Sequence, residues 1–558
     1  MQTTAARPWT IAFPWVARWH EPIKVTTLAD LLNAAVARSG EKRAVTYSAT
    51  TLTYRELAAD VDRLATGLRR LGIGRGDAVA LYLPNTLFHP ISFFAVTKLG
   101  AHVVHLSPLD APREIAHKMK DAGAKALVTT NHANLLTTAQ KLLEQGTIEQ
   151  LLVGDDAHWG GDPAVVPVPR SSRITPLLEL FVEPTGEPWP ALSPDDLAVL
   201  QYTGGTTGLP KGAMLTHANL TAAVSMYHGI NPAPDFKAGE ERVICVAPLF
   251  HIFGLSGIML SHLAHGNEIV LFPRFDAEAI VREIEINRAS IMPGVPTMWI
   301  AIANLPDIDK RDLSALKDAR SGGAPMPSDV QRRLEQKIGR RILGGWGMTE
   351  TSPAGTRLVP EEPSRPGLIG IPYPGIDMRI VALDDSSREL GVGEVGEIAV
   401  RGPNVFKGYW NRPEVNAEAF AAGYFLTGDI GSIDEKGQFT IVDRKKNMII
   451  SSGFNVYPAA IENAIYEHPG VREVIVIGVF DLYRGQAAKA FITLKPGARE
   501  LPIDELREFL KDRLGRHEMP AAVEYRDSLP RSPAGKLLAK VLIDEESAKL
   551  AQASAQVI

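Results

Sequence analysis

The stretch from Gln201 to Gly212 combines the residue types that bind phosphate. It follows an apolar run at 197–200, which predicts a buried strand, and it then becomes rich in glycine and threonine before a lysine. Backbone N–H groups of such a loop can turn inward as an anion nest, to which hydroxyls and a lysine charge add donors. The pattern predicts a polyphosphate site with the candidate residues Thr203, Gly204, Gly205, Thr206, Thr207, Gly208 and Lys211.

This stretch differs from the Walker A loop. Lys211 stands at the Walker distance from Gly205, but Pro210 occupies the position where that motif has glycine, and Gly212 the position of serine or threonine. A flexible surface turn is the alternative interpretation, and it gives no reason for this composition directly after a strand. We therefore expect a phosphate-binding loop of another type.

A second candidate site lies at the Gly-rich turn 345–348, which is followed by Thr349 and Glu350. A triphosphate would repel a carboxylate unless a cation lay between them, and Mg²⁺ prefers hard oxygen ligands. Glu350 is therefore a candidate Mg²⁺ ligand and Thr349 a candidate phosphate donor. The alternative for Glu350 is a solvated turn carboxylate.

Three further side chains could take part in chemistry with a nucleotide. Asp429 could accept both hydroxyls of a ribose, and Arg444, fifteen residues later, could reach the same sugar or a phosphate. Lys536 follows Gly535 in a Pro-rich stretch that predicts a loop. Taken alone, Asp429 is more typical of a turn residue and Lys536 of an exposed lysine.

His251 lies among aromatic and aliphatic residues at 249–253, where a histidine is more often a core residue than a base. The sequence contains no histidine and cysteine set with metal-ligand spacing, and no G-x-S-x-G motif of a serine hydrolase.

Bulk properties limit the class of protein. The chain has 558 residues, which predicts two or more domains, and its net charge of −5 argues against a nucleic-acid partner. A single cysteine, Cys245, excludes a disulfide framework and fits a reducing compartment. No window has the ~18–20 apolar residues that cross a bilayer. We expect a cytoplasmic protein with at most peripheral membrane contact, although aromatic residues at 9–19 more often pack an N-terminal arm.

Helix and strand patterns alternate along most of the chain. Thr53 and Glu56 predict a capping box at the start of a helix that ends before Gly72. Short apolar strands are predicted at 79–83, 103–106, 127–130 and 151–154, and an irregular connection at 155–195. This order predicts an α/β fold with largely parallel sheets, in which ligands collect at the strand ends.

The pattern changes after Gly391 to short alternating segments at 397–401, 424–429 and 438–442, which indicate antiparallel strands. A charged break follows at 443–446. We predict a large N-terminal α/β domain at 1–444, with packed sheets and a β-barrel-like subdomain, and a small mobile α+β domain at 445–558.

Taken together, these residues resemble the adenylate-forming (AMP-binding) superfamily, and among its members the acyl-CoA synthetases. The resemblance covers essentially the whole chain, and its most specific parts are the motifs at 202–211, 345–350, 426–429, 443–446 and 530–536. The sequence at 443–458 is most similar to that of bacterial medium- and long-chain fatty acyl-CoA ligases. A pimeloyl-CoA ligase is a further possibility.

The resemblance implies roles for individual residues. Lys536 is the adenylation lysine, and the loop 203–208 with Lys211, the turn 345–349, Asp429 and Arg444 bind ATP and AMP. Gly323, Ala324 and Pro325 form the adenine turn, Glu350 binds Mg²⁺, and Lys446 is a hinge. The remaining implied positions are the ATP-turn residues Gly345, Trp346, Gly347, Met348 and Thr349, the CoA-binding residues Ser452, Gly453 and Phe454, and the acyl-binding residues His251, Met298 and Gly322. His251 is also a catalytic candidate, together with Lys536.

The implied reaction has two steps and uses ATP, Mg²⁺ and CoA. A carboxylic acid is converted to an acyl-adenylate with release of pyrophosphate, and CoA then displaces AMP to give a thioester. The small domain rotates between the steps, so that Lys536 leaves the site and the stretch near Gly453 enters it. We expect a medium- to long-chain fatty acid as substrate, with a dicarboxylate as an alternative.

Other interpretations stay open at this point. The acyl group could pass to a carrier protein instead of CoA, the fold could be an inactive scaffold, and nothing supports or excludes luciferase-type oxygenation. A homodimer is a further possibility, and Lys536 could be a target of a lysine acetyltransferase.

Overall fold

The computed structural model describes residues 7–16, 19–161, 164–203, 210–229, 235–322, 326, 328–363, 365, 367–451, 454–482, 484–515, 518–531 and 537–555. The chain separates into two compact units. The first consists of Met1–Pro363, Ile369–Asp377 and Val400–Phe425, and the second of Ser364–Leu368, Met378–Ala399 and Leu426–Ile558. The division predicted at 444/445 stays a prediction.

The first unit contains a sheet that leads into the phosphate loop. Its strand order is β7-β6-β5-β3-β4-β8-β9, and all neighbouring strands are parallel except β8 and β9. The strands are β3 (Ala78–Leu81), β4 (His102–His105), β5 (Ala126–Thr130), β6 (Gln150–Gly154), β7 (Ile174–Pro176), β8 (Leu197–Thr203) and β9 (Lys211–Thr216). The strands predicted from the apolar runs are thus confirmed, with shifts of one or two residues.

A second sheet in this unit has the order β14-β13-β12-β10-β11-β1-β2 and is parallel except for the β1–β2 hairpin. Its strands are β1 (Arg43–Tyr47), β2 (Thr50–Thr53), β10 (Arg242–Cys245), β11 (Glu268–Leu271), β12 (Ile291–Gly294), β13 (Asp318–Ser321) and β14 (Ile342–Leu343).

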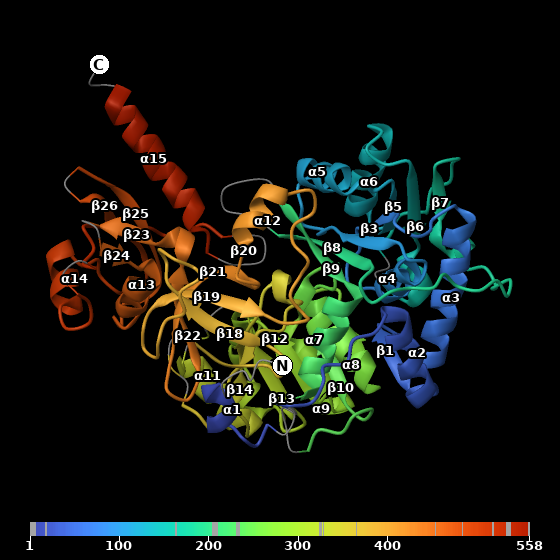
Figure 1. The fold of residues 1–558 in the computed structure, drawn as a ribbon, viewed down its shortest axis with the longest axis horizontal. Coiled ribbons are helices and arrows are strands. Elements are labelled where there is room, and N and C mark those ends of the chain that lie inside the picture. The colour runs from blue at the N-terminus through green and yellow to red at the C-terminus, as the bar shows by residue number, and fades with distance from the viewer. Residues whose placement is uncertain are drawn as a thin grey trace. The chain divides into compact units, whose positions relative to one another are not determined.

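Helices cover both faces of each sheet, as Figure 1 shows. One apolar core joins inward side chains of both sheets with helices between them, because Leu81 and Ile269 belong to the same buried cluster. Separate apolar clusters pack helices onto the outer faces. Met119 belongs to the cluster on the first sheet, and Ile284 belongs to the cluster on the second. The central helices are α2 (Leu28–Ser39), α3 (Tyr54–Arg70), α4 (Phe88–Lys98), α7 (His217–Gly229), the π-helix η3 (Phe253–Leu260) and α8 (Ser261–His265), and the outer helices are α5 (Pro112–Ala122), α6 (Ala133–Glu144), α9 (Ala277–Asn287), α10 (Pro296–Ala303) and α11 (Ser328–Ile338).

Local signals agree with these helices. Thr53 and Glu56 form the predicted capping box of α3, which ends at Arg70 before the glycines. At the N-terminus, α1 (Pro8–Ala12) buries Trp9, and Phe13 is buried beside it, as expected for a packed arm, whereas Trp15 is 50% exposed. The irregular connection at 155–195 contains only β7 and two short 3₁₀ turns, η1 (Asp156–Trp159) and η2 (Leu177–Leu180), among its described residues.

The remaining described elements of the first unit include an antiparallel ribbon. It consists of β15 (Gly345–Trp346), β16 (Thr356–Arg357) and β17 (Leu368–Pro372), and the other elements are η4 (Ile308–Lys310), η5 (Thr349–Thr351), α12 (Pro413–Ala419) and β20 (Phe420–Ala421).

The second unit is α+β. The strands β22 (Phe439–Arg444), β21 (Tyr424–Ile433), β19 (Gly396–Arg401) and β18 (Asp377–Val381) are neighbours in that order, and β21 and β22 are antiparallel, as the alternating pattern predicts. A short turn η6 (Lys445–Asn447) leads to a five-stranded sheet. Its elements are β23 (Ile449–Ser451), β24 (Phe454–Val456), β25 (Val471–Asp481), β26 (Gly485–Leu494), β27 (Ala522–Tyr525), α13 (Pro458–Tyr466), α14 (Ile503–Leu510) and α15 (Ala539–Ala555).

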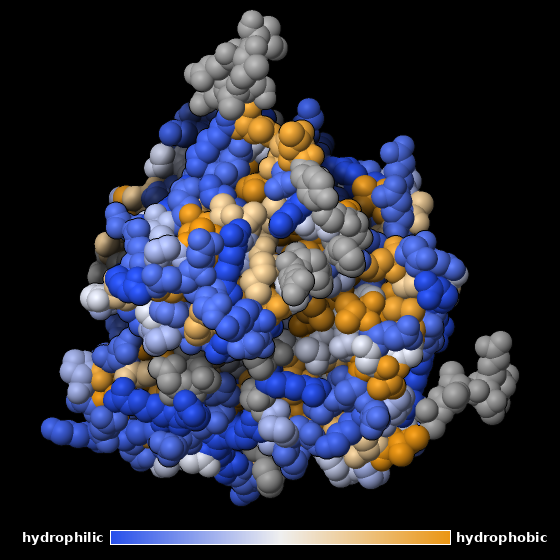
Figure 2. Space-filling model, turned by 90° about the vertical axis from the view of Figure 1, so that its left-hand side faces the viewer, coloured by the Kyte–Doolittle hydropathy of each residue, from blue (hydrophilic) through white to orange (hydrophobic). Residues whose placement is uncertain are grey.

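Hydrophilic residues predominate on the molecular face seen in Figure 2. Among the helices that the structure describes, none combines the length and apolarity needed to cross a membrane.

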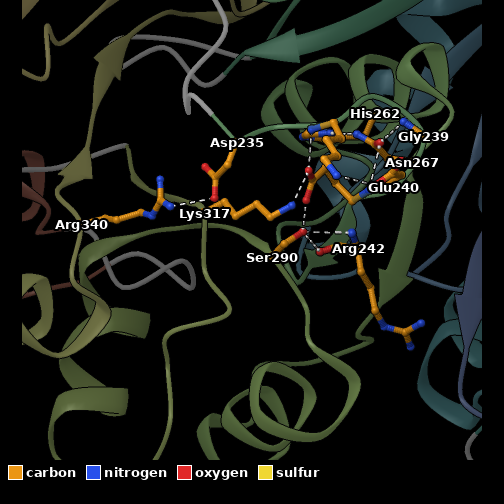
Figure 3. A network of polar contacts seen from close by, with 11 residues as sticks. Asp235, Gly239, Glu240, Arg242, His262, Asn267, Ser290, Lys317 and Arg340 are labelled. Atoms are coloured by element: carbon orange, nitrogen blue, oxygen red, sulfur yellow. Dashed lines mark hydrogen bonds and ion pairs between the residues drawn. The ribbon is translucent and has the colours of Figure 1, made fainter.

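Charged side chains tie together the amino ends of the second sheet (Figure 3). Arg242 Nη1 pairs with Glu268 at 2.6 Å and its Nε with Glu283 at 2.5 Å. Its backbone N–H donates to the Ser290 hydroxyl, which donates to Glu241 at 2.5 Å. Because ligands collect at the carboxyl ends of such sheets, we interpret this network as structural.

Replacing Arg242 with methionine is expected to destabilise the first unit by about 3 kcal/mol, because both carboxylates would stay buried without their cation. Thermal and urea unfolding measure the effect. Arg288→Met is the matched control, since Arg288 and its partner Asp312 are both more than half exposed. Equal losses in the two variants would contradict a buried ionic network.

A partly buried carboxylate in the second unit has a pKa near neutral pH. Glu462 on α13 accepts a 2.7 Å hydrogen bond from the Val476 N–H. Burial raises the pKa of Glu462 to about 7, the hydrogen bond opposes this rise, and the Asp443 charge adds to it. The folded state therefore holds a proton that the unfolded chain releases near 4.5.

The stability of the second unit is expected to fall as the pH rises from about 4.5 to about 7, by roughly 3 kcal/mol in all, because over this range the folded state binds more protons than the unfolded state. Glu462→Gln should remove most of this dependence. The measurement is the thermal midpoint of each protein from pH 5 to 8, with the exposed Glu467→Gln as control. A wild-type slope that survives in Glu462→Gln would contradict the assignment.

Candidate active site

The predicted phosphate loop connects two antiparallel strands. Thr203 ends β8, Lys211 begins β9, and the two residues face each other across the hairpin. The Thr203 hydroxyl lies 3.5 Å from the Lys211 carbonyl oxygen. A Walker A loop leads from a strand into a helix, so the return as a strand confirms that this is a different loop. The candidates Gly204, Gly205, Thr206, Thr207 and Gly208 lie outside the described residues.

Lys211 is joined to Glu350 through a tyrosine. The Lys211 Nζ lies over the Tyr409 ring, 4.6 Å from its centroid. The Tyr409 hydroxyl donates to Glu350 Oε1 at 2.8 Å. Burial, and then the Glu350 charge, raise the pKa of Tyr409 far above its usual range, so the hydroxyl stays a donor. Tyr409 was not predicted from the sequence, because its place beside these residues depends on the tertiary fold.

The Glu350 carboxylate is buried, which excludes a solvated turn residue. Glu350 is 5% exposed and belongs to η5, while Thr349 beside it is partly buried. The Asn404 side chain supports this turn by donating to the carbonyl groups of Thr351 and Ala354, both at 2.7 Å. At Gly347, a Cβ atom would lie 1.5 Å from the Pro353 carbonyl oxygen, so the turn requires glycine there.

Other residues of the turn lie in regular structure. Gly345 and Trp346 form β15, which pairs with β16. The Met348 N–H donates to the Thr351 hydroxyl at 3.1 Å. The structure thus brings this predicted turn, Lys211 and Glu350 into one part of the first unit.

The donor set around Glu350 fits Mg²⁺ only together with a phosphate ligand. Within the described part of the chain, no group of three or more histidine, cysteine, aspartate or glutamate residues could hold a metal ion. Mg²⁺ is commonly bound through one or two carboxylates together with substrate phosphates and water. A single buried carboxylate beside a phosphate loop has this character.

His251 is exposed and precedes the π-helix η3, so the alternative of a core histidine is wrong. The ring Nδ1 accepts a 3.2 Å hydrogen bond from the Phe253 backbone N–H, and the backbone N–H of His251 donates to the Pro248 carbonyl at 3.0 Å. These contacts hold the ring at the start of a buried apolar helix. π-Helical segments occur frequently at functional sites.

The acyl-binding candidates lie around the carboxyl end of the second sheet. Met298 is partly buried on α10, and its neighbour Trp299 donates its indole N–H to the Arg320 carbonyl at 2.9 Å. Gly322 follows β13, and a Cβ atom there would meet no atom of the described residues within 4 Å. Gly322 therefore borders open space, and Gly323, Ala324 and Pro325 lie outside the described residues.

Asp429 and Arg444 form an ion pair in the second unit. They face each other on β21 and β22, and Arg444 Nε lies 2.8 Å from Asp429 Oδ1. Asp429 is 1% exposed, whereas 48% of the Arg444 side chain is exposed. Asp429 is thus a strand residue with a cation partner, and the prediction that the two act together fits this geometry.

A buried glutamate that the sequence did not indicate positions this pair. Glu397 accepts a 3.0 Å hydrogen bond from the Gly428 N–H and pairs with Lys445 at 2.8 Å. One carboxylate therefore fixes both the turn before Asp429 and the residue after Arg444.

The proposed hinge lies directly after this anchor. The Lys446 side chain is exposed, and its pKa is lowered by partial desolvation of the ammonium and then by the Arg444 charge, while Asp429 opposes the change. Phe454 begins β24, which pairs with β23. The candidates Ser452, Gly453 and Lys536 lie outside the described residues.

Comparison with known proteins identifies the family. The pattern of the family "AMP-binding enzyme" matches residues 32–410, and that of the "AMP-binding enzyme C-terminal domain" matches residues 460–536. The chain is 34% identical to a long-chain-fatty-acid–CoA ligase of Bacillus subtilis over 97% of this chain and 98% of that one. It is 37% identical to a feruloyl-CoA synthase of Amycolatopsis over 89% of this chain and 94% of that one.

A solved structure agrees with this assignment. The crystal structure of ATP-bound MatB from Rhodopseudomonas palustris superposes with a TM-score of 0.80 at 29% identity, covering 93% of this chain and 98% of that one. The fold class, the phosphate hairpin and the family match point to the same conclusion. The chain belongs to the AMP-binding enzyme family and is an ATP-dependent acid–thiol ligase.

Proposed function

We propose that this ligase activates a medium- to long-chain fatty acid and transfers the acyl group to CoA. The observation that carries the proposal is the Lys211–Tyr409–Glu350 arrangement, in which a cation and a buried carboxylate both contact Tyr409 beside the phosphate hairpin. A cation beside a buried carboxylate suits a triphosphate that carries a metal ion, because the lysine can bind the phosphate and the carboxylate can bind the metal.

The proposed reaction has two steps. In the first, a carboxylate oxygen of the acid forms a bond to the α-phosphorus of ATP, and the bond to pyrophosphate breaks. In the second, the CoA sulfur forms a bond to the acyl carbon as its thiol proton leaves, and the bond to AMP breaks. Mg²⁺, when bound by Glu350 and the phosphates, neutralises charge on the departing pyrophosphate.

Individual side chains take distinct roles in this proposal. Lys211 and the loop 203–208 hold the β- and γ-phosphates, and Lys536 stabilises charge between the carboxylate and the α-phosphate. Asp429 accepts the ribose hydroxyls, and Arg444 orients its carboxylate. His251 lines the route of the acyl group and CoA.

The remaining predicted positions complete the site. Thr349 donates to a phosphate, residues 323–325 contact adenine, and residues 452–454 face the CoA arm. Lys446 is the hinge about which the C-terminal domain rotates between the two steps, the domains being 1–444 and 445–558.

The apolar π-helix η3 and the open space at Gly322 support a long acyl chain. The relatives named above act on long-chain fatty acids and, in the case of feruloyl-CoA synthase, on an aromatic acid. Pyrophosphate release with acids of graded chain length, followed by thiol consumption with CoA, tests the proposal. No release with any acid would refute it, and transfer only to a carrier protein would establish the alternative acceptor.

Regulation and assembly are further parts of the proposal. We expect a cytoplasmic enzyme, with a homodimer as the assembly to be tested by light scattering. Acetylation of Lys536 by a lysine acetyltransferase would remove the charge that adenylation needs.

Tyr409→Phe is expected to raise the Mg²⁺ concentration needed for half-maximal pyrophosphate release about tenfold, because Glu350 would lose the donor that orients its carboxylate. The ring beneath Lys211 would remain. Titration of Mg²⁺ at saturating ATP measures this. Tyr54→Phe is the control, since the Tyr54 hydroxyl donates to the Asn267 carbonyl in the core. Equal Mg²⁺ dependence in wild type and Tyr409→Phe would contradict this role.

Lys536→Ala is expected to lower adenylate formation from ATP at least about a hundredfold, because the charge that stabilises the transition state would be lost. Thioester formation from supplied acyl-adenylate and CoA should continue. The two half-reactions are measured separately, and an equal loss in both would contradict the assignment of Lys536 to the first step.

A further inference from the structure

Arg320 is an interior arginine whose side chain still reaches open space. It lies on β13, two residues before Gly322. Burial disfavours the charged form of its guanidinium, and yet 27% of the side chain is exposed. Arg320 therefore borders space that the described residues do not fill.

The alternation of side chains on β13 shows which side Arg320 occupies. Ala319 belongs to the cluster on the outer face of the sheet, with α9, α10 and α11. Successive residues of a strand point to opposite faces, so Arg320 points inward. That interior holds α7 and the π-helix η3, which pack together, and η3 follows the His251 loop.

Two tyrosines lie near enough to the guanidinium to interact with its charge. Tyr227 on α7 and Tyr373 stack edge to face with ring centroids 5.1 Å apart, and Arg320 interacts electrostatically with both. A Cβ atom on Gly257 of η3 would lie 3.7 Å from the Tyr227 hydroxyl, so these polar groups border the π-helix. Burial raises the pKa of Tyr227 far above its usual range, and its hydroxyl therefore stays protonated.

The hydrogen-bonding capacity of Arg320 is only partly used. Its Nε and Nη2 contact Asp318 Oδ2, at 2.9 Å and 2.6 Å. Nη1 makes no hydrogen bond to any residue that the structure describes, although a guanidinium carries five N–H donors. Burial disfavours the charged form of Arg320, but the Asp318 charge outweighs this and its pKa is raised.

A second buried guanidinium adds positive charge. Arg357 on β16 is 7% exposed, and its pKa is lowered by burial, while the Arg320 charge acts in the same direction. The pKa of His262 on α8 is also lowered, first by burial and in part by Arg320. The two guanidinium groups outnumber the single Asp318 carboxylate that contacts Arg320, so the space beside Arg320 favours an anionic oxygen over a neutral one.

We propose that Arg320 is a specificity-determining residue that binds an oxygen acceptor on the acyl tail, far from the reacting carboxyl. The inference rests on the proposed function and deepens it. The substrate class is an acid with a second oxygen group, and a terminal carboxylate suits the site better than a terminal hydroxyl. Tyr227 and Tyr373 supply neutral donors beside the guanidinium.

A comparison within the same sheet separates this role from a structural one. Arg242, at the amino end of the sheet, is paired with two carboxylates through Nε and Nη1, and 16% of its side chain is exposed. Arg320, near the carboxyl end, has one carboxylate partner and greater exposure. A purely structural arginine is expected to use its N–H donors on protein partners, because a buried unpaired N–H destabilises the fold.

The test compares octanoate, 8-hydroxyoctanoate and octanedioate, and the corresponding dodecane series, by pyrophosphate release. Wild-type enzyme should have a higher kcat/KM for the oxygen-bearing acids, and highest for the diacid. In Arg320→Met the kcat/KM ratio of diacid to plain acid should fall at least about tenfold, because a charge-assisted hydrogen bond is lost. Arg320→Lys should retain part of the ratio.

Arg242→Met is the matched control, since it also removes a guanidinium from a carboxylate in this sheet. An unchanged ratio in Arg320→Met, or an equal change in Arg242→Met, would overturn the proposal. Wild-type preference for the plain acid would overturn it even if Arg320→Met failed to fold. Activity on plain acids alone would contradict only this inference, whereas no activity on any acid would contradict the proposed function.

Discussion

The hydrogen bond from Tyr409 to the buried Glu350 carboxylate is the contact on which the nucleotide-binding part of the first unit depends. A carboxylate that is almost fully removed from water is tolerated only with strong partners. Tyr409 reaches it because the segment around residue 408 is fixed by backbone hydrogen bonds, from the Met214 N–H to the Gly408 carbonyl and from the Trp410 N–H to the Gly212 carbonyl. The phosphate hairpin and the Glu350 turn are thereby held by the same short segment.

The two ends of the second sheet serve different purposes. Its amino end is closed by carboxylates and cations that satisfy one another, as around Arg242. At its carboxyl end, Arg320 keeps N–H donors that no described residue accepts, and Gly322 leaves open space. Parallel strands direct all their carboxyl ends to one edge, so residues distant in sequence gather there. The fold therefore separates stability from binding along the strand direction.

The sequence predicted features that depend on local pattern. Apolar runs located β3 to β6 closely, and the capping box located the start of α3. The separation of Asp429 and Arg444 in the chain suggested a shared ligand, and the structure pairs them because a strand, a turn and a returning strand occupy that interval.

Contacts between distant segments could not be predicted in this way. Tyr409 and Glu397 act through partners that only the tertiary fold supplies, and a lone tyrosine or glutamate gives no periodic signal. The inward direction of Arg320 required knowledge that β13 has helices on both faces. The exposure of His251 was also missed, because its aromatic neighbours resemble a core segment although the loop lies at a sheet edge.

The contacts of Asp443 place a physical condition on the proposed hinge at Lys446. Asp443 precedes the hinge, but its carboxylate accepts hydrogen bonds from the Ala459 N–H at 2.7 Å and from the Asn447 side chain at 3.2 Å, both beyond it. A rotation at Lys446 has to break these bonds, and each buried polar group left unpaired costs about 1–3 kcal/mol. The Glu397–Lys445 pair, in contrast, lies entirely before the hinge and can persist. The rotation therefore requires new partners or water for Asp443, while the support of Asp429 by Glu397 need not change.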